Sequence, residues 1–351
     1  MKKFKKLVAI LGLAAITVAA VGCSQAEAKS NEDTTNAAAQ EKTQEETDKE
    51  KAEQEKIVVA DVNGETISLA DLNSELVYLE QLLMMQFGEN FKENEDAMAY
   101  YKEQQKLILD YLIESKLVVQ QAGENGINVT DEEIKEQIEQ VKQANGITTD
   151  EAYETALAQQ GLTPETYSQF IKESLIIAQT MELVTKDVTT NEDEVKAYYD
   201  DNIAKYTKAA GANMAHILVA TEDEAKQVKK EYEEGKTFEE LASTYGTDGT
   251  KDQGGSLGYI PYDSQQYDAD FLAGAKGLKE GEVSAPVKTQ FGYHLIKVTD
   301  VQSEPVVTPF EDVKAAAEQT VLQDKQYGVF EEYLKGIREK ATIEIFEDKL
   351  N

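Results

Sequence analysis

The stretch G-E-V-S-A-P-V-K-T-Q-F-G-Y-H at residues 281–294 carries the most information about the middle of this chain. It leads through glycine, proline and a turn into a short apolar strand, residues 291–298, on which His294 lies. A second strand-like run, M-A-H-I-L-V at residues 214–219, carries His216, and the chain of 351 residues contains no third histidine. Histidine titrates near neutrality and both donates and accepts hydrogen bonds, so the pair suggests one shared site. The alternative is two unrelated core histidines, each satisfied locally.

The first 23 residues indicate the compartment. Four lysines among residues 2–6 precede an apolar run from Leu7 to Gly22, and Cys23, the only cysteine, follows directly. This is the pattern of a secretory signal peptide, and its apolar run is shorter than the ~20 residues that a spanning helix needs. A lone cysteine after A-V-G resembles a bacterial lipobox, which implies cleavage before Cys23 and lipidation of its sulfur. The alternative is an ordinary secretory signal with an incidental cysteine.

The composition is strongly acidic. The formal net charge is −32 at pH 7, and removal of residues 1–22, which hold four lysines and no acidic residue, makes it about −36. Such a charge keeps a protein soluble and opposes binding to nucleic acid or to an anionic membrane surface. Arg338 is the only arginine, and arginine is the residue best suited to planar phosphate recognition, so a phosphate-reading site is not expected. Basic or neutral unfolded chains remain free to approach.

The pattern of residue types divides the chain into five segments. Residues 1–22 are the expected signal peptide, and residues 23–56 form a lipidated cysteine followed by a flexible polar tether, because residues 24–56 contain no large apolar side chain. Residues 57–207 and 304–351 show helical periodicity, whereas residues 208–303 mix strands, glycines and short helices. The sequence therefore predicts an α+β protein in which a small α/β module is inserted into a mainly helical domain.

Several local signals place elements in the helical segments. Asn63-Gly64 predicts a hairpin turn, and N-cap residues predict helix starts at Ser68, Thr130 and Thr163. Further helices are expected over residues 96–122, after residue 190 and over 310–340, with a short strand at 342–346. The segment L-L-M-M at residues 82–85 is interpreted as a helix core stripe in preference to a client-binding surface, although methionine suits adaptable surfaces.

The module at residues 208–303 closely resembles a parvulin-type peptidyl-prolyl isomerase domain. The matching residues are H-I-L-V at 216–219, F-E-E-L-A at 238–242, T-D at 247–248, G-G-S-L-G at 254–258 and the opening stretch at 281–294. With the lipobox and the helical flanks, the chain is similar to the PrsA family of foldase lipoproteins of Gram-positive bacteria. The flanks also resemble, more loosely, the chaperone domains of SurA and trigger factor.

The resemblance implies catalysis of cis–trans isomerisation at X–Pro bonds, without a cofactor or a metal. It assigns the site to two sets of residues: catalytic His216, Asp248, Thr289 and His294, and a proline pocket of Met214, Leu257, Tyr267 and Phe271. It implies an extracytoplasmic foldase anchored by lipid on the outer face of the bacterial cytoplasmic membrane, acting on unfolded or partly folded secreted proteins. A homodimer formed through the helical domain is a further expectation. The acidic run T-E-D-E at residues 221–224 argues against a phosphoserine-proline substrate.

Three other functions remain open on the sequence alone. The first is a non-enzymatic holdase chaperone that uses the module only to bind clients. The second is a metal site, since two histidines and a carboxylate resemble a facial triad. The third is a solute-binding lipoprotein, which would need a larger α/β region.

Overall fold

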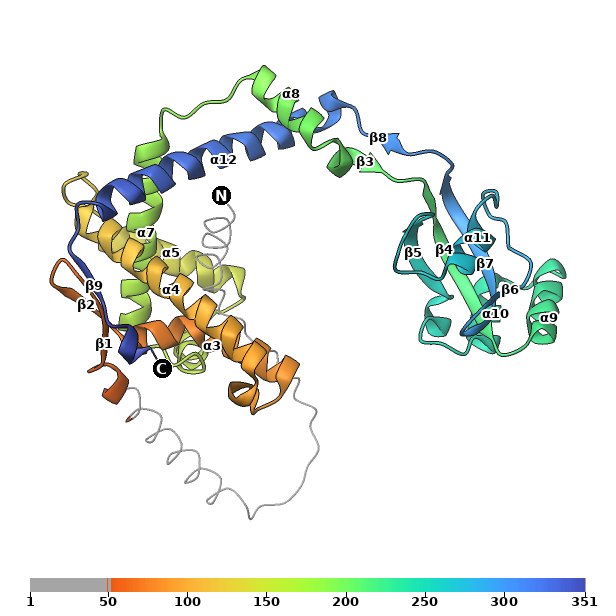
Figure 1. Ribbon diagram of the computed structural model, residues 1–351, viewed down its shortest axis with the longest axis horizontal. Coiled ribbons are helices and arrows are strands. Elements are labelled where there is room, and N and C mark those ends of the chain that lie inside the picture. Colours follow the sequence, from red (N-terminus) through yellow and green to blue (C-terminus); the bar gives the residue numbers. More distant parts are fainter. Residues whose placement is uncertain (1–48, 50–51, 351) are drawn as a thin grey trace, which may run out of the picture. The chain divides into compact units, whose positions relative to one another are not determined.

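The structure, a computed structural model, describes residue 49 and residues 52–350 (Figure 1). The predicted signal peptide and Cys23 lie outside the described residues. Of the predicted tether, only residue 49 and residues 52–56 are described, and residues 52–54 are helical. The chain divides into two compact units, a first unit that ends at Thr189 and resumes at Leu322, and a second unit, Thr190–Val321.

The first unit is mainly helical. Its elements are β1 (Val58–Val62), β2 (Glu65–Ser68), α3 (Leu69–Phe87), η1 (Phe91–Glu93), α4 (Glu95–Gln121), α5 (Asp131–Ala144), α6 (Asp150–Ala158), α7 (Pro164–Thr185), the larger part of α12 (Phe310–Arg338), β9 (Ile343–Ile345) and η4 (Glu347–Lys349). The predicted hairpin is confirmed, because β1 pairs antiparallel with β2 and both Asn63 and Gly64 adopt positive φ, as a tight hairpin turn requires.

The predicted helix starts are also confirmed. Ser68, Thr130 and Thr163 each cap a helix, with the side chain accepting from a backbone N–H in the first turn. In each case the third residue of the helix bonds back to the cap, so two otherwise unpaired N–H groups are satisfied. The helix α6, whose N-cap is Thr149, was not predicted.

The two ends of the first unit meet in one sheet of order β2-β1-β9, with Val62 opposite Ile343. The C-terminal helix α12 adds Phe330 and Leu334 to the core formed by α4, α5, α6 and α7. Arg338 on α12 also donates to Asp110 on α4 at 2.9 Å. The segments before and after the second unit are therefore held together by main-chain pairing, core packing and an ion pair.

The core-stripe interpretation of residues 82–85 is wrong for three of its four residues. Leu83 is buried, but Leu82, Met84 and Met85 are 42%, 41% and 83% exposed. Helical periodicity marks one buried face of α3, and no described element covers the other face.

The second unit contains a four-stranded sheet. Its elements are α8 (Glu192–Asp201), η2 (Ile203–Tyr206), β3 (Thr207–Lys208), β4 (Gly211–Val219), α9 (Glu222–Glu233), α10 (Phe238–Tyr245), η3 (Lys251–Gln253), β5 (Ser256–Pro261), α11 (Ala269–Ala275), β6 (Val287–Thr289), β7 (Gly292–Gln302), β8 (Val306–Val307) and the start of α12. The strand order is β5-β4-β7-β6, antiparallel throughout, with β4 and β7 side by side (Figure 1).

Each face of this sheet has its own apolar core. Helices α9 and α10 pack on one face, around Ile217, Phe238 and Leu295. Helix α11 packs on the other face, around Met214, Phe271 and other side chains. The compact unit is longer than the predicted module of residues 208–303, because α8 and the start of α12 group with it, and the module boundaries stay a prediction. Among the described residues, no helix is both long and apolar enough to span a membrane.

Candidate active site

The sheet register brings the two histidines together. Leu218 on β4 lies opposite His294 on β7, and His216 lies opposite Ile296, so the histidines are diagonal neighbours on the two central strands. Side chains two residues apart on a strand share a face, and diagonal neighbours are within reach of large side chains. The two rings stack at 5.2 Å between centroids, and both residues are buried, at 7% and 5% exposed.

One continuous chain of hydrogen bonds runs through the pair. Asp248 Oδ2 lies 3.0 Å from His216 Nε2, and the Nδ1 atoms of His216 and His294 lie 3.0 Å apart. At the far end, Thr289 Oγ1 lies 2.8 Å from His294 Nε2, and it also accepts from the backbone N–H of Phe291 at 3.1 Å. The structure thus brings together all four residues that the sequence analysis assigned to catalysis.

The chain admits one consistent direction with both imidazoles neutral. The Asp248 carboxylate only accepts, so His216 donates through Nε2 and its Nδ1 is free to accept from His294 Nδ1–H. His294 Nε2 then accepts from the Thr289 hydroxyl. A second proton on His216 would place two N–H donors face to face at the Nδ1–Nδ1 contact, as long as His294 keeps its proton on Nδ1.

Burial supports this neutral state. Desolvation lowers the pKa of His216, and the nearby Asp248 carboxylate offsets part of that effect. Desolvation also lowers the pKa of His294, to about 4, and the neighbouring His216 lowers it further. Since the pKa of each ring is shifted downward from the ordinary value for histidine, the neutral form of both rings is favoured at neutral pH.

Asp248 is held by the loop that follows α10. Thr247, the residue before it, donates to the Leu218 carbonyl at the end of β4 through both its N–H (3.1 Å) and its hydroxyl (2.9 Å). The Thr250 hydroxyl lies 3.1 Å from both carboxylate oxygens of Asp248. Sequence reasoning missed Thr250, although a threonine two residues after an aspartate is a common local hydrogen-bonding arrangement.

The four predicted pocket residues gather on the same face of the sheet. Met214 and Phe271 belong to the buried cluster there, and Leu257 and Tyr267 pack against it half-buried. The Phe271 ring meets both imidazoles edge-on, with centroids 5.8 Å from His216 and 5.3 Å from His294, and Tyr267 stacks on it at 6.0 Å. Met214 is only 2% exposed, so it supports the wall from within.

Gly255 lets β5 approach the strand of His216. Its φ is +74°, and a Cβ there would collide with the His216 carbonyl oxygen. The His216 N–H donates to the Gly255 carbonyl at 2.8 Å, beside an irregularity in the β4–β5 register. The G-G-S-L-G motif thus fixes the backbone on which one histidine sits.

The acidic run after the first histidine strand has a structural role. Thr221 is the N-cap of α9, and Glu224 closes its capping box. Glu222 and Asp223 lie in the first turn, where negative charge is favourable to the helix dipole. These groups leave the N-terminus of α9 acidic, which opposes a phosphate.

The histidine pair offers no vacant nitrogen for a metal. All four ring nitrogens already lie within 3.0 Å of Asp248, of Thr289 or of each other. Within the part of the chain that the structure describes, no group of three or more His, Cys, Asp or Glu residues is arranged to hold a metal ion.

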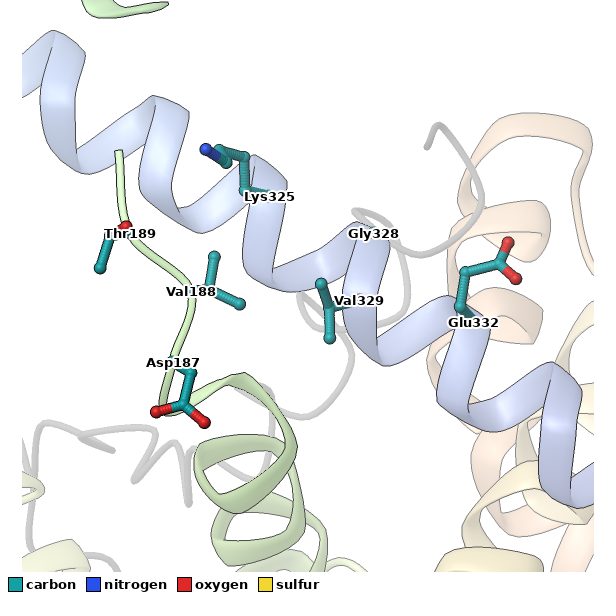
Figure 2. A pocket seen from close by; sticks show the side chains of 7 residues that line it. All are labelled: Asp187, Val188, Thr189, Lys325, Gly328, Val329 and Glu332. Atoms are coloured by element: carbon teal, nitrogen blue, oxygen red, sulfur yellow. The ribbon is translucent and has the colours of Figure 1, made fainter. Parts of the chain in front are cut away.

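A separate hollow lies in the helical unit, between residues 187–189 and α12 (Figure 2). Its volume is about 640 Å³, and its lining includes Val188 and Val329 together with charged Lys325 and Glu332. It is an open surface without a histidine, and it presents no aligned donor and acceptor chain. We therefore take the histidine pair as the candidate active site.

Comparison with known proteins agrees with this geometry. Residues 190–315 match the family model described as PPIC-type PPIASE domain, and residues 1–181 match the SurA-like N-terminal domain. The matched isomerase region makes the second unit a parvulin-type peptidyl-prolyl isomerase. It contains the hydrogen-bond chain and the apolar wall described above.

Relatives extend the likeness to the whole chain. The foldase protein PrsA of Clostridium kluyveri is 39% identical over 300 residues, which cover 82% of this chain and 88% of that protein. The foldase protein PrsA of Clostridium acetobutylicum is 33% identical over 353 residues and covers both chains completely. Among solved structures, a SurA-like chaperone of Campylobacter jejuni is 26% identical with a TM-score of 0.39, covering 82% of this chain and 100% of that one. On the sequence identity to full-length relatives and the two matched domains, this chain belongs to the PrsA family of foldase proteins.

Proposed function

We propose that this foldase rotates X–Pro bonds of its clients over the face of the sheet where His216, His294 and Phe271 meet. The observation that carries the proposal is the chain Asp248–His216–His294–Thr289, which satisfies two buried imidazoles without charging them. Clients of a foldase are unfolded or partly folded proteins, and an X–Pro bond in such a chain interconverts in tens to hundreds of seconds without help.

The reaction needs no bond to be broken. The planar amide is held by resonance, and rotation faces a barrier of ~18–20 kcal/mol. The twisted amide has lost its charge separation, so an apolar surrounding favours it over either planar form. Catalysis then follows from tighter binding of the twisted state. Phe271, Leu257 and Tyr267 supply that surrounding.

The polar residues shape the floor of the site. Neutral His216 and His294 present a surface of low charge beneath the reacting amide. The acceptor-only Asp248 carboxylate orients His216 and, through the Nδ1–Nδ1 contact, sets the tautomer of His294, whose Nε2 then accepts from the Thr289 hydroxyl. In this assignment neither histidine acts as a nucleophile, a metal ligand or a proton-abstracting base.

The setting of the reaction belongs to the same proposal. A lipid on Cys23 would anchor the chain to the outer face of the cytoplasmic membrane, and the polar segment after it would act as a tether. The charge of about −36 that remains after removal of residues 1–22 favours basic or neutral clients over acidic ones. The lipobox sequence and the acidic composition support this assignment.

The helical unit supplies a second surface. Helix α3 and the start of α4 expose a set of large apolar side chains: Val77, Tyr78, Leu82, Met84, Met85, Phe87 and Tyr100. Large exposed apolar patches mark interaction sites, and methionine adapts to varied partners. We assign this surface to extended client segments, and a homodimer that encloses a client between two such surfaces fits the same exposure.

A peptide assay tests the enzymatic assignment. The full chain should accelerate the cis–trans relaxation of a proline tetrapeptide, and His294→Ala should abolish most of that acceleration. Thr244→Val is the matched control, because the Thr244 hydroxyl bonds only within α10, to the Glu240 carbonyl. If the full chain suppresses client aggregation but never accelerates any peptide, the holdase alternative replaces the proposal.

A further inference from the structure

Phe291 is an exposed aromatic side chain beside the histidine chain. It is 68% exposed, and within residues 208–305, all of which the structure describes, it is the one large apolar side chain that is exposed. Leaving such a ring in water forgoes the favourable free energy of burial. The ring makes no aromatic contact with another described residue, whereas Phe271 contacts both histidines and Tyr267.

The backbone of Phe291 is tied to the site. Its N–H donates to Thr289 Oγ1 at 3.1 Å, and that oxygen lies 2.8 Å from His294 Nε2. These two bonds place the Phe291 amide nitrogen within about 6 Å of the buried imidazole. The backbone that carries the Phe291 ring is therefore held in place by its hydrogen bond to Thr289.

Neither the turn nor the core requires a phenylalanine at this position. Residues 290–291 form a two-residue connection between Thr289 and Gly292, which lie opposite each other in the β6–β7 pairing. The positive φ of this turn falls on Gly292, where a Cβ would also crowd the Val219 carbonyl oxygen. Polar residues and glycine are the usual choices in such short connections.

We propose that Phe291 is a specificity-determining residue, which binds an apolar client side chain one or two residues away from the target proline. The inference rests on the proposed site, since it takes the proline to lie against Phe271 and the histidine floor. Two residues of extended peptide span about 7 Å, and the Phe291 amide nitrogen lies within about 6 Å of the His294 ring, so one or two residues are enough to bridge the two places. The neighbouring client residue then covers the exposed ring.

The expected preference is for aromatic and large aliphatic neighbours of proline. A pair of aromatic rings adds about 0.5–1.5 kcal/mol beyond the burial of their area, so an aromatic neighbour should gain about 2- to 12-fold in kcat/KM over alanine. Unfolded secreted chains expose such residues, whereas folded surfaces largely hide them. Phe291 would thereby favour prolines in segments that are still unfolded.

The test uses the full chain and eight peptides, which carry Phe or Ala at one of four positions: one or two residues before proline, or one or two residues after it. The variants are Phe291→Ser and the conservative Phe291→Tyr. The native chain should prefer Phe over Ala on at least one side of proline, Phe291→Ser should lose that preference, and Phe291→Tyr should retain it. Each variant keeps a backbone N–H at residue 291, so the bond to Thr289 persists.

Two controls separate the possible failures. Unchanged histidine NMR signals in Phe291→Ser would show that the floor is intact and that lost preference reflects the ring alone. Equal preference in the native chain and in Phe291→Ser, with full activity in both, would overturn the inference and leave the proposed function standing. No acceleration of any peptide by the native chain would instead overturn the proposed function, and the inference with it.

Discussion

The neutral histidine pair predicts that acid destabilises the second unit before most carboxylates titrate. Burial lowers the pKa of His294 from 6.5 to about 4, and it lowers the pKa of His216 in the same direction. A depressed histidine pKa means that the unfolded state binds protons first as the pH falls. Stability is therefore unaffected above about pH 6.5 and is lost progressively between there and pH 4.

The size of the effect follows from the shift. A fall from 6.5 to about 4 corresponds to about 3 kcal/mol of lost stability for His294 alone once the pH has passed through both values. That is a large fraction of the 5–15 kcal/mol by which a domain is typically stable. Burial raises the pKa of Glu75 and of Glu114 in the helical unit, and those groups act with the opposite sign.

Histidine-selective labelling provides the assay. With two histidines in the chain, a labelled sample gives two ring signals, and each is titrated from pH 7.5 to 4 while the second unit stays folded. The His294 signal should titrate near pH 4, and the His216 signal should titrate below the ordinary value of 6.5. Asp248→Asn is the informative variant, because removal of the carboxylate charge should lower the pKa of His216 further. A native midpoint at or above 6.5 for either ring would refute the neutral chain.

Three further changes probe the same structure. Thr289→Val leaves His294 Nε2 buried without a donor and should cost about 1–3 kcal/mol, measured by chemical unfolding. Gly255→Ala forces a Cβ against the His216 carbonyl oxygen at a positive φ, so both isomerase activity and melting temperature should fall together. Gly328 lies within α12, and a Cβ added there would meet no other atom. Gly328→Ala should therefore stabilise the helical unit by about 0.5–1 kcal/mol and leave isomerase activity unchanged. A destabilised variant would contradict the open surroundings of Gly328.

Local chemistry explains why much of the fold could be predicted from sequence. The caps at Ser68, Thr130 and Thr163 act within four residues, so the sequence alone displays both partners of each bond. The same holds for the Asn63-Gly64 turn. The exposure of Met85 could not be predicted, because it depends on which distant element covers α3. Periodicity identifies a face of a helix but not the partner of that face.

In the candidate site, too, the sequence predicts some features, and others depend on how distant elements pack together. The resemblance named His216, Asp248, Thr289 and His294, but no spacing in the sequence gives the direction of their hydrogen bonds. That direction depends on the two-residue offset between His216 and His294 in the β4–β7 register, and on the loop that returns Asp248 to the end of β4. It is a property of the assembled sheet.

The closed chain also explains why both histidines are needed in one place. A single buried imidazole beside Asp248 would leave its second nitrogen without a partner, at a cost of about 1–3 kcal/mol. The second histidine donates to that nitrogen, and its own Nε2 then requires a donor. The Thr289 hydroxyl is that donor, and the same oxygen accepts from the Phe291 N–H, which ends the chain. Each member is neutral or already paired. In the proposed function this makes the floor polar enough to be oriented and leaves the two imidazoles uncharged beneath an amide whose transition state has lost its charge separation. A proton-transfer enzyme would need one of these nitrogens exposed and near its titration point, and burial of both rings gives the opposite arrangement.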